Sequence, residues 1–335
     1  MKLLKKKDEK KTEQEKVDER REEVLAAGRK FKYPLQWTKH RVVINTVLIS
    51  FIVLAIVVLS GWLALYRFNM TDDMLYRITK AIPVPVASID GENVRFSDYL
   101  MLYRSSMLSI ERQADQLDTQ ESIDTLRPFY MRQALTEAEE YTYALKLARE
   151  NNIEVTNDEV NAEFDRHLHI GGVERSESSF MKIIEENFGL NRSEYNRMLY
   201  LSLIKAKVEA LVDNNAEKIA AKVEAEITSK NGDYAAVAEI LGDKIIYEET
   251  GGMVSAQNID GGRASEAIKL QPGQESGRFI SMNGDGYYFV KLIKKTETEV
   301  NFVSIKVPFT EFTKQFEEIK EANKISEYIA LPENS

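Results

Sequence analysis

An apolar segment at residues 42–66, VVINTVLISFIVLAIVVLSGWLALY, constrains the fold of this chain more than any other feature. It contains 25 residues and no charged side chain. About 20 apolar residues in a helix cross the hydrocarbon core of a bilayer, so this segment can span a membrane with some tilt. A buried helix of a soluble protein is seldom apolar over this length, and a cleaved signal peptide has a shorter apolar region. The sequence therefore predicts one transmembrane helix.

The residues that flank the span predict its orientation. Five basic residues and no acidic residue occupy positions 29–41, whereas Asp72 and Asp73 follow the span closely. Positively charged flanks stay in the cytoplasm. We therefore expect residues 1–41 to form a charged cytoplasmic tail and residues 67–335 to be extracytoplasmic.

The formal charge changes sign along the chain. Residues 1–66 hold 14 Lys and Arg against 8 Asp and Glu, a charge of +6. Residues 67–335 hold 31 Lys and Arg against 46 Asp and Glu, a charge of −15. A basic arm on an acidic body indicates two compartments or two partners, and the acidic body argues against binding to nucleic acid.

Residues 67–230 show mainly helical periodicity. An Asp90-Gly91 pair between alternating residues predicts a short hairpin, after which apolar residues recur at spacings of three and four. Two helix starts carry capping boxes, Thr156 with Glu159 and Asn191 with Glu194. We expect this region to be a packed helical module.

Residues 231–309 contain short apolar runs that alternate with glycine-rich turns. ESGRFISM and GYYFVKLI flank the turn Asn283-Gly284-Asp285-Gly286 and predict a hairpin, and EVNFVSIKVPF predicts a further strand. Residues 310–335 form a C-terminal helix and tail, with an amphipathic helix expected over 310–329. The expected fold class is α+β, with a transmembrane helix, a helical module and a small α+β domain.

The sequence contains few residues suited to catalysis or metal binding. It has no cysteine and three histidines, His40, His167 and His169. His167 and His169 are two positions apart, so they point to different sides of a helix. No phosphate-binding loop, dinucleotide motif, HExxH or nucleophile elbow is present. We expect no metal ion and no cofactor.

Several segments resemble a known family. VASIDGENVRFSDYL, ARENNIEVTNDEV and FGLNRSEYNRMLYLSLIKAKVEALV are similar to the chaperone module of membrane-anchored foldases of the SurA, PrsA and PpiD type. DYAAVAEIL, GG at 251–252 and AIKLQPGQESGRFISMNGDGYYFVKLIKK resemble their parvulin-type (PpiC) prolyl isomerase domain. Together the two likenesses cover most of residues 84–308. The resemblance implies a SurA N-terminal-like chaperone module at 67–230 and a parvulin-like domain at 231–309.

The resemblance also implies where a catalytic site would lie, and there the sequence departs from the family. Parvulins isomerise X–Pro bonds with two histidines and a Cys or Asp, in a pocket lined by Met and Phe. Tyr288 stands in place of the histidine of the closing strand. Asp243 is the candidate nearest the Cys or Asp position. Ser304 stands where the other histidine would be, if residues 300–307 replace the missing first strand as in a circular permutation.

The permutation requires the strand at 286–294 to pair with that at 300–307. The resemblance implies weak or absent isomerase activity, because both family histidines are replaced. It leaves Tyr287, Tyr288, Phe289 and Met253 as candidates for substrate binding.

We therefore expect a membrane-tethered extracytoplasmic chaperone that binds unfolded or nascent polypeptides. One alternative is an active parvulin-type prolyl isomerase that uses Tyr287, Tyr288 and Asp243. Another is a membrane scaffold for one specific folded partner, such as the secretion machinery.

Overall fold

The computed structural model describes the backbone of residues 2–117, 123–169 and 173–331. It describes the side chains in these ranges apart from those of residues 2–13, 29–40, 114–117 and 124. The chain divides into two compact units, Met1–Ala64 and Leu65–Ser335.

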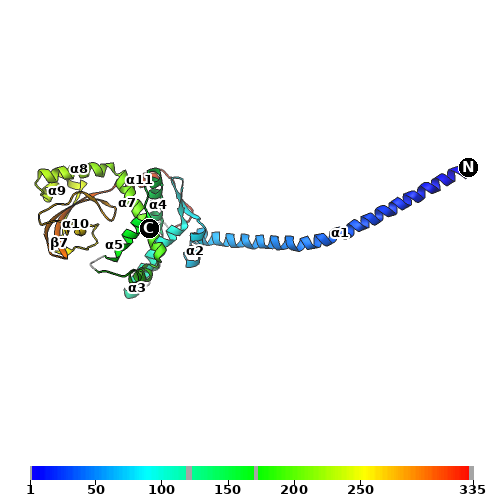
Figure 1. Ribbon diagram of the computed structural model, residues 1–335, viewed down its shortest axis with the longest axis horizontal. Helices are drawn as coiled ribbons and strands as arrows, with labels where there is room; N and C mark the ends of the chain where they lie inside the picture. Colours follow the sequence, from blue (N-terminus) through cyan, green and yellow to red (C-terminus); the bar gives the residue numbers. More distant parts are fainter. Residues whose placement is uncertain (1, 118–122, 170–172, 332–335) are drawn as a thin grey trace. The chain divides into compact units, whose positions relative to one another are not determined.

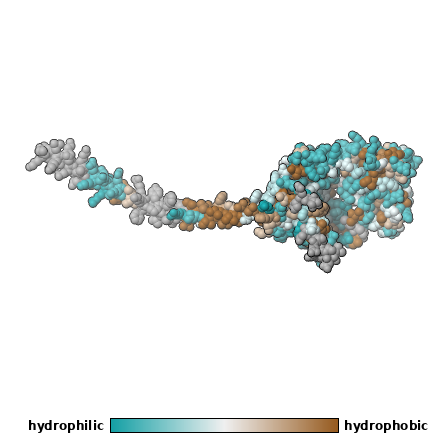
Figure 2. Space-filling view, turned by 180° about the vertical axis from the view of Figure 1, so that it is seen from behind, coloured by the Kyte–Doolittle hydropathy of each residue, from teal (hydrophilic) through white to brown (hydrophobic). Residues whose placement is uncertain are grey.

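The first unit contains the helix α1 (Lys2–Trp62), and the short π-helix η1 (Leu63–Arg67) that follows it spans the boundary between the two units. Among the described residues, Arg41–Arg67 is the stretch long and apolar enough to cross a membrane. Figure 2 shows it as a brown apolar band, in contrast to the teal polar residues nearer the N-terminus. The expected span at 42–66 lies within this stretch. The basic flank that predicts its orientation falls mostly outside the described side chains, so the orientation stays a prediction.

The second unit begins with a largely helical region. α3 packs on α4 and α6, and α7 packs on α4 and α5. The helices are α2 (Asp73–Ala81), α3 (Phe96–Leu117), α4 (Ile123–Glu150), α5 (Asn157–Leu168), α6 (Glu177–Phe188), α7 (Arg192–Val212) and α8 (Asn214–Ser229).

Both expected capping boxes are present at the helix starts. The Thr156 hydroxyl accepts a hydrogen bond from the Glu159 backbone N–H at 3.2 Å, and the Glu159 carboxylate accepts one from the Thr156 N–H at 2.8 Å. Asn191 and Glu194 make the equivalent pair at 3.1 and 3.0 Å. Each box satisfies two N–H groups that the helix itself leaves without a partner.

A small sheet joins the start of the second unit to its end. It contains β1 (Pro85–Ile89), β2 (Glu92–Arg95) and β8 (Ile325–Glu327), in the order β2-β1-β8. The expected hairpin turn is present, with positive φ angles at Asp90 and Gly91. β8 pairs antiparallel with β1, and the Tyr328 N–H donates to the Val86 carbonyl at 2.9 Å.

The C-terminal helix is shorter than the sequence predicted. α11 (Glu311–Glu321) ends eight residues before the expected end at 329. Asn323 takes a left-handed conformation with φ of 54°, which stops the helix. The following residues form β8 instead, because the open edge of β1 supplies backbone hydrogen bonds that an exposed helix end would leave to water. The expected helix over 310–329 was therefore wrong in its second half.

A larger antiparallel sheet forms the rest of the second unit. Its order is β3-β7-β6-β5, and β4 also pairs with β7. β6 pairs with β7 from Gly286↔Pro308 to Lys295↔Val300, so the pairing that the permutation requires is present. The elements are α9 (Tyr234–Leu241), the 3₁₀ helix η4 (Gly242–Lys244), β3 (Ile246–Glu249), β4 (Val254–Ser255), α10 (Arg263–Ala267), β5 (Phe279–Ile280), β6 (Gly286–Lys295) and β7 (Glu299–Pro308).

Helices cover both faces of the larger sheet (Figure 1). α8 and α9 pack on the face that carries Phe289 and Ile305, whereas α10 packs on the face that carries Val290 and Phe302. Side chains alternate between faces along a strand. Tyr287 and Tyr288 therefore lie on opposite faces, with Tyr288 on the α10 face.

The larger sheet contacts the helical region through the turn between β5 and β6. A Cβ atom at Gly284 would lie 2.3 Å from the Cβ of Ala206 in α7. The buried Asp213, between α7 and α8, accepts hydrogen bonds from the Ala216 N–H at 2.7 Å and from the Thr310 N–H at 2.6 Å. These contacts link the sheet, α7 and the start of α11.

Candidate functional site

Two regions of the second unit could bind or act on another molecule. One is a polar cluster on the α10 face of the larger sheet, and the other is a groove among the helices. The polar cluster, here the Tyr288 cluster, consists of Tyr288, Ser304, Lys306, Arg263 and Glu248.

Strand register brings the Tyr288 cluster together. Tyr288 and Lys306 are cross-strand partners of β6 and β7, and Glu248 of β3 is the partner of Ser304. Arg263 of α10 lies above them, with its guanidinium carbon 5.2 Å from the centre of the Tyr288 ring. Its Nη1 donates to the Ser304 Oγ at 3.3 Å and also pairs with the Glu248 carboxylate.

The side chain of Tyr288 is buried within this cluster. The side chain is 4% exposed and stacks on Phe279 with 6.0 Å between ring centres. Burial raises the pKa of its hydroxyl, and the nearby Asp285 raises it further. The ring therefore carries a neutral phenol, and its packing with Arg263 and Lys306 has a cation–π component.

The remaining residues that the sequence predicted for this site are dispersed. Tyr287 lies on the opposite face, 4.9 Å from the Phe309 ring, and Phe289 belongs to the core beneath α8 and α9. Asp243 is exposed in η4, and Met253 is half-buried before β4. Neither of these two lines the cavities beside the Tyr288 cluster. The structure thus places Tyr288 and Ser304 in one polar cluster, and Tyr287 and Phe289 in the core on the opposite face.

Two cavities lie beside the Tyr288 cluster. One, of about 350 Å³, is lined by Glu248, Arg263 and Ser304 from the cluster. The other, of about 240 Å³, lies between the end of α5 and the loop that precedes α10, and the two cavities share Asn258 and Asp260.

The smaller cavity contains a histidine to which sequence reasoning gave no role. His169, the residue that follows α5, lines this cavity with Asp260 and Met282. Burial raises the pKa of Asp260, although the Ala264 N–H donates to its carboxylate and opposes the shift. No local signal in the sequence could have placed His169 there, because these residues are about 90 positions or more apart.

The second region is an apolar groove of about 400 Å³ among α3, α4, α6 and α7. Its apolar side chains come from all four helices and from the loop before α7. Three serines of α3 add hydroxyl groups to its lining. The groove is lined by Ser105, Ser106, Ser109, Ile110, Tyr130, Ile184, Phe188, Leu190, Tyr195 and Met198.

A polar pocket of about 240 Å³ continues the apolar groove. The two share Ser105, Phe188 and Leu190. The pocket adds charged groups, including Arg104 and Glu194. The combined surface therefore offers apolar contacts at one end and charged contacts at the other.

The described residues provide no group of three or more His, Asp or Glu side chains placed to hold a metal ion. His167 has a structural role, because its Nδ1 lies 2.6 Å from the Tyr195 hydroxyl and its Nε2 lies 3.2 Å from Glu163. The geometry of both regions suits noncovalent binding, through apolar surface in the groove and through charged and aromatic groups on the sheet.

Comparison with known proteins found no matching protein-family model, curated protein or solved structure. The likeness to foldase chaperones therefore remains an interpretation of the sequence segments described above.

Proposed function

We propose that this protein is a membrane-tethered chaperone that binds extended apolar segments of unfolded polypeptides. The apolar groove among α3, α4, α6 and α7 is the observation that supports this proposal most directly. The tether is the apolar stretch that ends at Arg67. The basic residues that precede the span favour an extracytoplasmic location for residues 67–335. The sheet domain, which resembles a parvulin, would supply a second binding surface.

The composition of the groove suits a binder of many sequences. Its volume of about 400 Å³ lies within the usual range of roughly 300–1,000 Å³ for binding pockets, enough for a few side chains. Phe188 at its edge is 38% exposed, and Met198 has a flexible, polarizable side chain that adapts to different shapes. The serine hydroxyls of α3 can bond to the backbone of an extended peptide.

A test of this proposal is suppression of aggregation. The full chain, in nanodiscs, would be mixed with a reduced and unfolded client while light scattering is recorded, with empty nanodiscs as the control. We expect scattering to fall when the chaperone and the client are equimolar. Unchanged scattering at a large excess of the protein would contradict the proposal. Cross-linking that recovers one stoichiometric folded partner, and no mixture of clients, would favour the scaffold alternative.

A second candidate function is prolyl isomerisation, which the cavity lined by His169, Asp260 and Met282 favours. These residue types resemble those of a parvulin pocket, although they come from different places in the chain. X–Pro isomerisation has a barrier of ~20 kcal/mol, so even modest catalysis is measurable. We propose that activity is weak or absent. Acceleration of isomerisation in a proline peptide by the full chain, abolished in His169→Ala and retained in Tyr288→Phe, would establish this second function instead.

A further inference from the structure

The first helix after the candidate span, α2, has an exposed apolar side. Met74 and Ile78 are four residues apart and therefore lie on one side of the helix, and Ile82 is the extended residue that directly follows its last turn. They are 71%, 40% and 59% exposed, respectively. We call these three residues the outer stripe of α2. Phe68 and Met70, which lie between the span and α2 in the sequence, are exposed as well.

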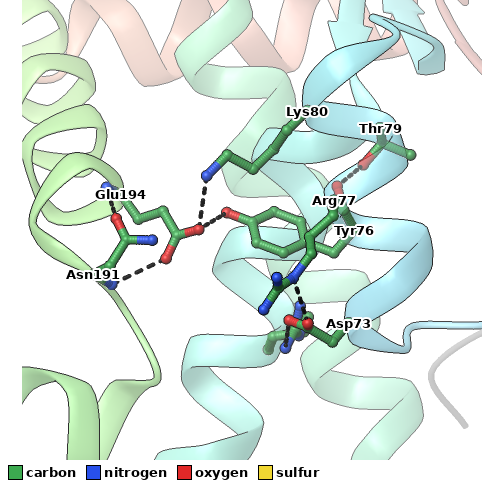
Figure 3. A network of polar contacts seen from close by, with 8 residues as sticks. Asp73, Tyr76, Arg77, Thr79, Lys80, Asn191 and Glu194 are labelled. Atoms are coloured by element: carbon green, nitrogen blue, oxygen red, sulfur yellow. Dashed lines mark hydrogen bonds and ion pairs between the residues drawn. The ribbon is translucent and has the colours of Figure 1, made fainter.

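The opposite side of α2 is fastened to the rest of the second unit. Leu75, Tyr76 and Thr79 are buried. The Tyr76 hydroxyl donates to Glu194 Oε1 at 2.9 Å, and Lys80 Nζ donates to the same oxygen at 2.8 Å (Figure 3). Because these bonds hold α2 by its inner side, the helix cannot rotate to bury its outer stripe within its own unit.

The outer stripe follows the end of the span closely in the sequence. Arg67 is the last residue of the apolar stretch, and Ile82 is only 15 residues further on. Six residues separate Arg67 from Met74, so the chain can extend at most about 25 Å between them. A large apolar surface on a soluble domain marks a binding site, and the bilayer interface is the apolar surface within this reach.

We propose that the outer stripe of α2 inserts into the bilayer interface, with α2 lying in the membrane plane. The three apolar side chains would enter the boundary between headgroups and acyl chains, as in other interfacial amphipathic helices. Arg77, which pairs with Asp73 at 2.6 Å and has a side chain 78% exposed, would direct its remaining N–H groups to the headgroup phosphates. The partner is the lipid surface itself, and the inference rests on the membrane tether of the proposed function.

The absence of native cysteine permits a direct test on the full chain. Single cysteines at Ile78, Val57 and Lys314 would each carry a spin label, with one chain in each nanodisc. Accessibility to oxygen, which concentrates in lipid, would be compared with accessibility to a water-soluble nickel chelate. Val57 reports on the span, and Lys314, exposed on α11, reports on water. Met74→Cys gives a second label on the outer stripe in case Ile78→Cys folds poorly.

We expect the oxygen-to-nickel ratio at Ile78 and Met74 to exceed that at Lys314 severalfold and to approach that at Val57. A lipid-like ratio at Val57 with a water-like ratio at both stripe positions would overturn the inference and leave the tether intact. A water-like ratio at Val57 would overturn the tether and the inference together. Low accessibility to both reagents at the stripe would show that protein covers it, which also overturns the inference.

Discussion

Tyr76 and Glu194 are 118 positions apart in the sequence, yet the Tyr76 hydroxyl donates a 2.9 Å hydrogen bond to Glu194 Oε1. This bond joins α2 to the first turn of α7 (Figure 3). Glu194 also accepts from Lys80 and from the Asn191 N–H, so one carboxylate both caps a helix and holds a second helix against it. The charge of this one buried side chain therefore contributes to the attachment of α2, beside the burial of Leu75 and Thr79.

Replacement of Glu194 by Gln should destabilise the chain at neutral pH by roughly 1–3 kcal/mol, because Tyr76 and Lys80 lose a charged acceptor. Burial alone would raise the pKa of Glu194, but the bonds from Lys80, the Asn191 N–H and Tyr76 outweigh it and lower the pKa from 4.5. The stabilisation that this carboxylate provides is therefore complete above pH 4.5 and is lost as the pH falls through the lowered pKa.

Urea unfolding of the full chain in detergent at pH 7 and pH 4 would measure this effect. We expect the wild type to lose more stability than Glu194→Gln between the two pH values. Glu239→Gln, at an exposed position of α9, serves as the matched control. Equal pH dependence in the wild type and in Glu194→Gln would contradict the prediction.

Glu139 should make the stability of the chain depend on pH in the opposite direction from Glu194. Its side chain is 3% exposed, and among the described residues its Oε1 has no hydrogen-bond partner. Burial raises its pKa to about 8, with a further contribution from Glu327 in β8. Between pH 4.5 and about 8 the folded chain retains a proton that the unfolded chain releases, so this group makes stability fall as the pH rises.

Glu139→Gln keeps the shape of the side chain and removes the charge. We expect it to raise the free energy of unfolding at pH 8 by roughly 1–3 kcal/mol and to have a much smaller effect at pH 4.5. Thermal unfolding across this pH range is the measurement. An equal change in the free energy of unfolding at all pH values would indicate that the charge of Glu139 is not the cause.

Gly284→Ala should weaken the contact between the larger sheet and α7. The new methyl group would lie 2.3 Å from the Ala206 Cβ, so the turn or the helix must move. Gly273→Ala is the matched control, since both glycines have a positive φ (74° and 84°) but a Cβ at Gly273 meets nothing within 4 Å. We expect about 1 kcal/mol of backbone strain in both variants. The overlap should cost Gly284→Ala roughly a further 1–3 kcal/mol in thermal unfolding, and equal costs would refute the overlap.

Polar substitutions in the apolar groove should weaken client binding. Phe188→Ser and Met198→Ser each remove apolar contacts, and we expect each to raise the Kd for an unfolded client roughly tenfold. Fluorescence anisotropy of a labelled client would measure the change. Ile240→Ser is the control, because Ile240 is an exposed apolar residue on α9 outside the groove. An equal loss of binding in the control would point to nonspecific hydrophobic binding.

Helix caps and tight turns, which are set by residues close together in the sequence, were predicted correctly. The capping boxes at Thr156 and Asn191 and the Asp90-Gly91 turn are present as expected. β3 was missed because its four residues, mostly exposed, show no clear alternation and are held in a sheet by pairing with β7. β8 was mistaken for helix because its partner β1 lies more than 230 residues away. Neither pairing leaves a signal in the local sequence.

The residues of the candidate site also divide into those that the sequence could predict and those that it could not. That Tyr288 and Ser304 lie on one face of the sheet could be inferred once the resemblance placed both where family histidines would be, although their partners across β6 and β7 are Lys306 and Val290. Arg263 above Tyr288 and His169 beside Asp260 could not, because helix packing and long loops bring them there.

The sequence by itself determined the apolar stretch, the helix starts and the β5–β6 hairpin, since hydrophobic periodicity, capping and short turns act over a few residues. Only the tertiary structure decided that Tyr288 is buried, that four helices enclose the apolar groove and that α2 turns its outer stripe outward. These features depend on contacts between residues far apart in the chain, such as Tyr76 and Glu194, which form only when the whole unit packs.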